Sequence, residues 1–151
     1  MKKIIGTAAV LAVICAFGSA HADELLITSA KNKGGSATAL DVVSDGSTTA
    51  LQIRLNVGEG QKVDLSNCVS GLPSTHTGVC AYKNGKVTIL VHSDKNELLP
   101  AGVVSIGSVT MSSKNRVPMT IAEVMAFDRN GNDVGIKSTL DMDSGESRMI
   151  K

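Results

Sequence analysis

Two histidines are the first candidates for acid–base or metal chemistry in this sequence. His76 lies between two cysteines, and His92 ends an apolar run just before Asp94. An imidazole can ligate a metal or act as a general base, but a metal site needs further ligands at a spacing such as H-x-H or H-E-x-x-H. Neither histidine has such a neighbour, so we expect both to be solvated surface residues.

The stretch AFDRNGNDVGIK, residues 126–137, has the residue types of a calcium loop. Four oxygen-bearing side chains surround one glycine: Asp128, Asn130, Asn132 and Asp133. A helix–loop–helix calcium site needs glycine at position 6 and a bidentate carboxylate at position 12. Counted from Asp128, position 6 is Asp133 and position 12 is Thr139, so the bend and the strongest ligand are both missing.

The same stretch fits a β-hairpin better. With Asn130-Gly131 as a two-residue turn, the register sets Phe127 opposite Val134 and Met125 opposite Ile136. It also sets Asp128 opposite Asp133, which is unfavourable unless water or a cation screens the two charges. A weak surface calcium site at this pair therefore stays open. We expect no other metal and no cofactor.

Cys68 and Cys80 are 12 residues apart and form the candidate redox pair. The third cysteine, Cys15, lies in the N-terminal leader described below. An even pair in an exported chain indicates a disulfide, which would stabilise the fold by about 3 kcal/mol on the chain-entropy estimate. The alternative is a redox or thiolate site, which the pair's lack of C-x-x-C spacing disfavours.

The sequence gives only weak support for a copper site built from methionines or for a serine nucleophile. Five methionines could supply thioether ligands to copper: Met111, Met119, Met125, Met142 and Met149. The first three lie in apolar runs, where methionine usually fills gaps in the core, and the last two are far apart in a polar tail. Serine, histidine and aspartate are all present, but no G-x-S-x-G nucleophile elbow is. We expect no catalytic residues and no enzyme.

Residues 1–22 have the pattern of a secretory signal. Two lysines precede an apolar run from Ile4 to Phe17, and the small residues Ala20 and Ala22 follow. This pattern predicts cleavage after Ala22, and the run is too short for a stable membrane span. We expect a soluble mature protein in the periplasm or outside the cell.

The composition of the mature chain excludes several classes of partner. Removal of residues 1–22 from the 151 leaves 129, and the loss of Lys2 and Lys3 leaves 13 basic against 14 acidic residues. A near-neutral chain without a basic cluster argues against nucleic acid and anionic membranes. Tyr82 and Phe127 are the only aromatic residues left, so a stacking platform for sugars or bases is not expected.

The elements that position these residues are short strands. TALQIRLNV, residues 49–57, alternates apolar and polar residues, and KVTILVHS, residues 86–93, repeats the pattern. Further runs complete about eight or nine strands: ELLITSA, ATALDVVS, KVDLS, VVSIGSVTMS and MTIAEVMAF. No run keeps a helical period, which favours an antiparallel β-sandwich or barrel. We expect a domain over residues 23–138 and a flexible tail over 139–151.

Asn84-Gly85 gives the clearest register. A type I′ turn at this pair sets Tyr82 opposite Val87 and Cys80 opposite Ile89. The face that buries Ile89 should therefore also carry the sulfur of Cys80.

Two long segments resemble cohesin-type domains. MTIAEVMAFDRNGNDVGI resembles the C-terminal end of such a domain, and GVCAYKNGKVTILVHSDKNELLPAGVVSIGSVTM resembles its middle. The resemblance runs from about Leu25 to Ile136. It implies a nine-stranded jelly-roll sandwich whose flat sheet face binds a partner protein, which in cellulosomal systems is a dockerin.

The expected function follows from this resemblance. It is a non-catalytic module that binds a dockerin-like or other secreted or envelope protein through a sheet face. The alternative is a module for a polysaccharide or cell-wall glycan, since jelly-roll sandwiches often bind sugars. The sequence does not assign the residues that contact the partner.

Overall fold

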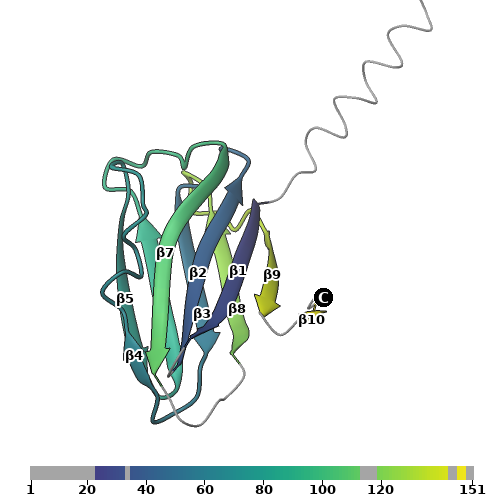
Figure 1. Cartoon of the computed structure of the whole chain (residues 1–151). Helices are drawn as coiled ribbons and strands as arrows, with labels where there is room; N and C mark the ends of the chain where they lie inside the picture. Colours follow the sequence, from purple (N-terminus) through teal and green to yellow (C-terminus); the bar gives the residue numbers. More distant parts are fainter. Residues whose placement is uncertain (1–22, 33–34, 113–118, 143–145, 149–151) are drawn as a thin grey trace, which may run out of the picture.

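The structure is a computed structural model that describes residues 23–32, 35–112, 119–142 and 146–148. The described residues form two β-sheets packed face to face (Figure 1). In these ranges there is no helix long and apolar enough to cross a membrane. The predicted all-β sandwich is confirmed.

The larger sheet has six strands in the order β10-β9-β1-β2-β7-β4. Their bounds are β1 Asp23–Asn32, β2 Gly35–Ser44, β4 Lys62–Asp64, β7 Gly102–Ser112, β9 Ile136–Met142 and β10 Glu146–Arg148. The smaller sheet has the order β5-β6-β3-β8. Its bounds are β3 Ala50–Asn56, β5 Thr77–Lys83, β6 Lys86–His92 and β8 Thr120–Phe127. The ten strands among the described residues exceed the expected eight or nine, because the sequence does not predict the three-residue strand β10.

The core lies between the sheets and follows the alternation read from the sequence. Ile53 and Leu55 of β3 and Val87 and Ile89 of β6 are fully buried. Strands β1 and β2 supply Leu25, Ile27, Leu40 and Val42 from the other side. Because successive side chains of a strand point to opposite faces, the polar residues between them must lie on the outside of the sandwich.

The β5–β6 hairpin forms as predicted. Asn84 and Gly85 have φ of 52° and 76°, as a type I′ turn requires. Tyr82 pairs with Val87, and Cys80 pairs with Ile89. The Tyr82 hydroxyl donates to the Gly58 carbonyl at 2.6 Å, which fastens the hairpin to the loop after β3.

The predicted hairpin around Asn130-Gly131 is wrong in its pairing. β8 pairs with β3, whereas β9 pairs in parallel with β1 in the other sheet. The segment that connects β8 and β9 makes one isolated bridge to β8, from Asp133 to Phe127. The chain turns at Gly131 and again at Gly135, with φ of 79° and 75°, and this double turn carries it from one sheet to the other.

This crossing changes the roles of two further side chains. Met125 lies beside Gln52 on the outside of the smaller sheet, so the expectation that it fills the core is wrong. Ile136 packs against the core and does not face Met125. Met119 is buried and Met111 is partly buried against the core, as expected.

The expected flexible tail also needs correction. β9 extends to Met142, so residues 139–142 belong to the larger sheet. Leu140 pairs with Ile27 and is 4% exposed. The segment was misread because it places one clearly apolar side chain inward and its pairing partner lies more than 100 residues earlier. Residues 1–22, 143–145 and 149–151 lie outside the described ranges.

Candidate functional site

The outer face of the smaller sheet carries an aliphatic pair. Val79 of β5 pairs with Leu90 of β6, and their exposed fractions are 58% and 39%. Gln52 of β3 continues the row beside Leu90, and Met125 of β8 ends it beside Gln52. The register thus places one apolar row across all four strands, interrupted by a single amide. We call these four residues the β5–β8 row.

The next row of the same face is polar. Arg54 and Glu123 form an ion pair at 3.0 Å, with both side chains partly exposed. Gln52 donates to the same carboxylate at 3.4 Å. The two charges therefore satisfy each other and give the apolar row a polar border on this side. Protein-binding surfaces commonly place polar residues at the rim of an apolar centre.

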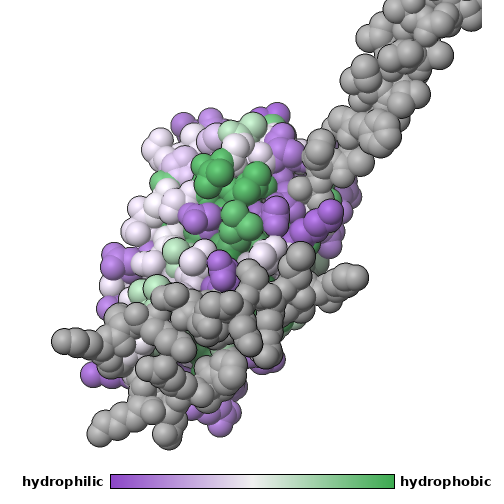
Figure 2. Space-filling model, turned by 45° about the vertical axis from the view of Figure 1, so that its right-hand side comes forward, coloured by the Kyte–Doolittle hydropathy of each residue, from purple (hydrophilic) through white to green (hydrophobic). Residues whose placement is uncertain are grey.

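The outer face of the larger sheet differs. Val103 is 73% exposed and pairs with Val43, and Leu26 lies on the same face. Figure 2 shows a small group of apolar atoms on this side of the molecule, ringed by polar residues. The remaining outward side chains on β1, β2 and β7 are mostly short, such as Thr28 and Ala39. The large apolar side chains of this face are therefore confined to one end of it.

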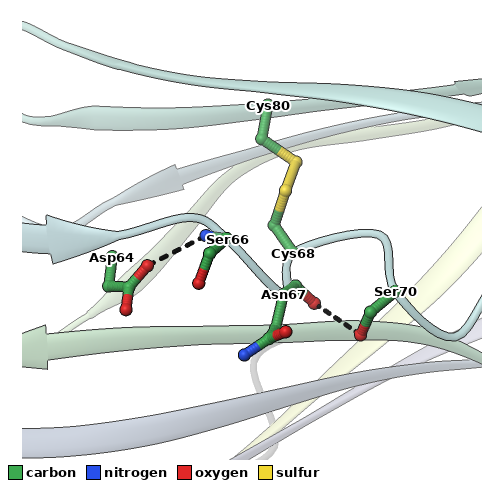
Figure 3. Close-up of a disulfide and its surroundings, with 6 residues drawn as sticks. All are labelled: Asp64, Ser66, Asn67, Cys68, Ser70 and Cys80. Carbon is green, nitrogen blue, oxygen red and sulfur yellow. Dashed lines mark hydrogen bonds between the residues drawn. A yellow bond between two sulfur atoms is a disulfide. The ribbon is translucent and has the colours of Figure 1, made fainter.

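The structure forms the disulfide expected between Cys68 and Cys80 (Figure 3). Cys68 lies in the loop after β4, and Cys80 lies on β5, at the edge of the smaller sheet. The loop rests on β7: the amide of Ser108 donates to Asn67 at 2.8 Å, and a Cβ at Gly107 would lie 2.3 Å from the Asn67 carbonyl. The bond therefore links the strand that carries Val79 to a loop anchored on the opposite sheet.

His76 is buried, so the expectation of a solvated side chain is wrong. It is 5% exposed, and its Nε2 lies 3.2 Å from the Thr49 carbonyl oxygen. Its Nδ1 lies 2.8 Å from the hydroxyl of Thr75. The loop between the cysteines folds back over the start of β3, and burial there lowers the pKa of the imidazole. Both ring nitrogens are engaged, which suits a structural role better than general-base chemistry.

His92 is exposed, as expected. Its Nε2 lies 3.3 Å from Asp94 and 3.2 Å from the Thr77 hydroxyl. In the part of the chain that the structure describes, no group of three His, Cys, Asp or Glu side chains could hold a metal ion.

Asp128 organises the loop that resembled a calcium site. Its Oδ1 accepts the amides of Asn130 and Asn132 at 2.8 and 2.9 Å, and its Oδ2 accepts the Asn132 side chain at 3.2 Å. These hydrogen bonds, led by the Asn132 amide, lower the pKa of Asp128. Asp133 instead accepts the Gly135 amide and bridges to Phe127, so the expected Asp128–Asp133 opposition is not formed.

Comparison with known proteins identifies the fold. No protein-family model and no curated protein sequence matches the chain. A type II cohesin module from the ScaA scaffoldin of Acetivibrio cellulolyticus matches with a TM-score of 0.60 at 10% identity, over 87% of this chain and 94% of that one. The chain has a cohesin-like fold.

Two further solved structures support the cohesin-like fold. A non-cellulosomal cohesin from the archaeon Archaeoglobus fulgidus matches with a TM-score of 0.57 at 13% identity, over 83% of this chain and 94% of that one. A type I cohesin–dockerin complex from Clostridium thermocellum matches with a TM-score of 0.56 at 14% identity, over 81% and 95%. The resemblance read from the strand and turn pattern is therefore confirmed.

The sequence alone does not assign the residues of the β5–β8 row to a binding surface, although it contains part of the information. The Asn84-Gly85 register already implies that Val79 faces Leu90, because it sets Cys80 opposite Ile89. The position of Met125 in the same row depends on β3 pairing with β8. Nothing local indicates this pairing.

Removal of the disulfide should loosen the β5 edge. The double variant Cys68→Ser/Cys80→Ser should lose about 3 kcal/mol of unfolding free energy, because the unfolded chain regains loop entropy. Urea denaturation measures this loss. Ser74→Ala, an exposed position in the same loop, should change the value by less than about 0.5 kcal/mol. An unchanged midpoint in the double variant, or two titratable thiols in the native protein, would contradict the assignment.

His76 should make the domain less stable in mild acid. Its folded-state pKa is lowered, so its contribution is complete above the unfolded value of about 6.5 and is lost as pH falls below it. Urea denaturation at pH 7 and pH 5 should show a smaller loss in His76→Gln than in the wild type. His92→Gln should behave as the wild type, because His92 is exposed. Equal losses in all three proteins would refute a role for His76.

Calcium should leave the melting temperature unchanged. Both oxygens of Asp128 already accept hydrogen bonds from the loop, and Asp133 is turned to Gly135. Calorimetric titration of the chain freed of metal with EDTA should show no binding heat. A saturable heat that disappears in Asp128→Asn would show that the loop binds calcium after all.

Proposed function

We propose that this cohesin-like domain is an exported, non-catalytic module that binds a partner protein through the outer face of its smaller sheet. The observation that carries the proposal is the exposed pair of Val79 and Leu90 on adjacent strands. Interfaces concentrate binding energy in a few central apolar residues surrounded by polar contacts. The β5–β8 row, with the Arg54–Glu123 ion pair beside it, has this arrangement.

The comparisons support a protein as the partner. Two of the similar structures are complexes between a type I cohesin and a dockerin from Clostridium thermocellum. These complexes show that a sandwich of this shape can serve as a protein receptor. For the present chain the partner class is a dockerin-like or other secreted or envelope protein. Export rests on the pattern of residues 1–22, and the disulfide suits an oxidising compartment.

The smaller sheet is a better candidate than the larger one. Its β5–β8 row has apolar side chains on three of its four strands, whereas the apolar group on the larger sheet is confined to one end. Its edge strand β5 is held by the disulfide, and its hairpin tip is held by Tyr82. A surface that is fixed before binding loses less conformational entropy when the partner docks.

Capture experiments with matched variants test the proposal. The tagged chain should enrich a specific protein from the exported fraction of its native host, and Val79→Lys/Leu90→Lys should weaken capture at least about tenfold, the cost of losing central contacts. Val103→Lys, a still more exposed valine position on the other face, should capture as the wild type does. If Val103→Lys abolishes capture and the double variant does not, the face is assigned wrongly.

A binding assay on insoluble polysaccharides separates the glycan alternative. The β5–β8 row contains no aromatic ring, and the Tyr82 hydroxyl is engaged with Gly58. The chain should therefore remain in the supernatant with cellulose, chitin and peptidoglycan. Retention on one of these, lost in Val79→Lys/Leu90→Lys, would replace the protein partner with a glycan.

A further inference from the structure

The start of β1 holds a buried acidic group. Asp23 is 1% exposed, although it is the first residue of its strand. Its Oδ1 accepts the amide of Asp45 at 2.9 Å, and its Oδ2 accepts the hydroxyl of Thr48. Thr48 is itself fully buried. The Asp23 carboxylate is thus hydrogen-bonded to two residues of the turn between β2 and β3.

No basic side chain balances this group among the residues that the structure describes. The ion pairs there are Arg54–Glu123 and His92–Asp94. The nearest charged neighbour is Asp45, a second carboxylate, and burial together with this neighbour raises the pKa of Asp23. A buried carboxylate without a cation is costly.

The other charged groups on the paired strands lie on the opposite side of the sheet. Glu24 is next to Asp23 in β1, so its side chain points outward. Lys137 of β9 pairs with Glu24 and is exposed on that outer face. Asp23 itself pairs with Ile136 and faces inward. The inward side of this corner therefore has negative charge only.

We propose that removal of residues 1–22 supplies the missing positive charge, because hydrolysis between Ala22 and Asp23 leaves the α-ammonium group of the mature chain beside the buried Asp23 carboxylate. Water adds across the peptide bond, the Ala22 carboxylate departs with the leader, and the former amide nitrogen of Asp23 becomes the ammonium. An α-amino group has a pKa of about 7.7 to 8.0, so it carries charge at pH 7. Processing then stabilises the first strand as well as releasing the domain.

This proposal rests on the export part of the proposed function, but its test does not involve the partner. A chain that begins with Asp23 is compared with one that begins with Gly-Ser-Asp23, whose ammonium is displaced by two residues. Both chains contain every residue that the structure describes. At pH 7 the chain with Asp23 first should melt at least about 3 °C higher. At pH 9.5, where the amine is neutral, this difference should disappear.

Two variants show whether the carboxylates are responsible. Asp45→Asn should reduce the difference between the two chains, and Asp23→Asn should abolish it. If Asp23→Asn does not fold, the result with Asp45→Asn and the pH 9.5 comparison still decide. Equal melting temperatures at pH 7, or a difference that survives both substitutions, would overturn the proposal.

Mass spectrometry of the mature protein from its native host supplies the last check. The proposal expects Asp23 as the first residue, and a different first residue would overturn it. Binding through Val79 and Leu90 would be unaffected by that outcome, so failure of this proposal and failure of the proposed binding face are distinguishable.

Discussion

The strict alternation of β3 and β6 is the constraint on which the rest of the structure depends. Ile53 and Ile89 are cross-strand partners, and both can face the core only if the residues next to each in its own strand face outward. A shift of β3 by one residue would turn Arg54 inward and Ile53 outward, so the register is strongly determined. The same requirement that builds the core therefore places Leu90 and Gln52 on the outer face. The alternation of apolar and polar residues thus determines both the core and the candidate surface.

The edges of the smaller sheet are held by contacts from elsewhere in the fold. On one side, the disulfide joins β5 to a loop that rests on β7, where glycine at position 107 permits close approach. On the other side, β8 continues into a double turn that leads to β9 in the larger sheet. Asp128 caps this turn with its hydrogen bonds. Contacts from the rest of the fold therefore hold both edges of the candidate surface in place.

Local patterns were sufficient to predict much of this architecture. The period-two runs and the Asn84-Gly85 turn predict β3, β5 and β6, the register of Cys80 and the sandwich class, because each depends on residues close in sequence. The long-range pairings were not predictable in this way. Asn130-Gly131 has the composition of a hairpin turn, but a second glycine four residues later takes the chain to the other sheet.

The remaining errors have the same origin. His76 is polar and lies in a loop, and only the fold shows that the loop returns over Thr49 and buries it. The prediction of a tail from residue 139 cuts β9 short, because the polar sequence around Leu140 conceals a strand that pairs in parallel with β1. No sequence pattern indicates that Asp23 is buried, since its burial depends on the turn at Thr48. Sequence patterns therefore located the strands, while contacts between distant segments decided which polar groups are buried.

Hydrogen exchange of the domain with and without its captured partner tests the central claim most directly. The account predicts added protection of backbone amides in β5, β6 and β3, centred on Val79 and Leu90, with β1, β2 and β7 unchanged. Protection confined to the larger sheet around Val103, with β5 and β6 unchanged, would contradict it.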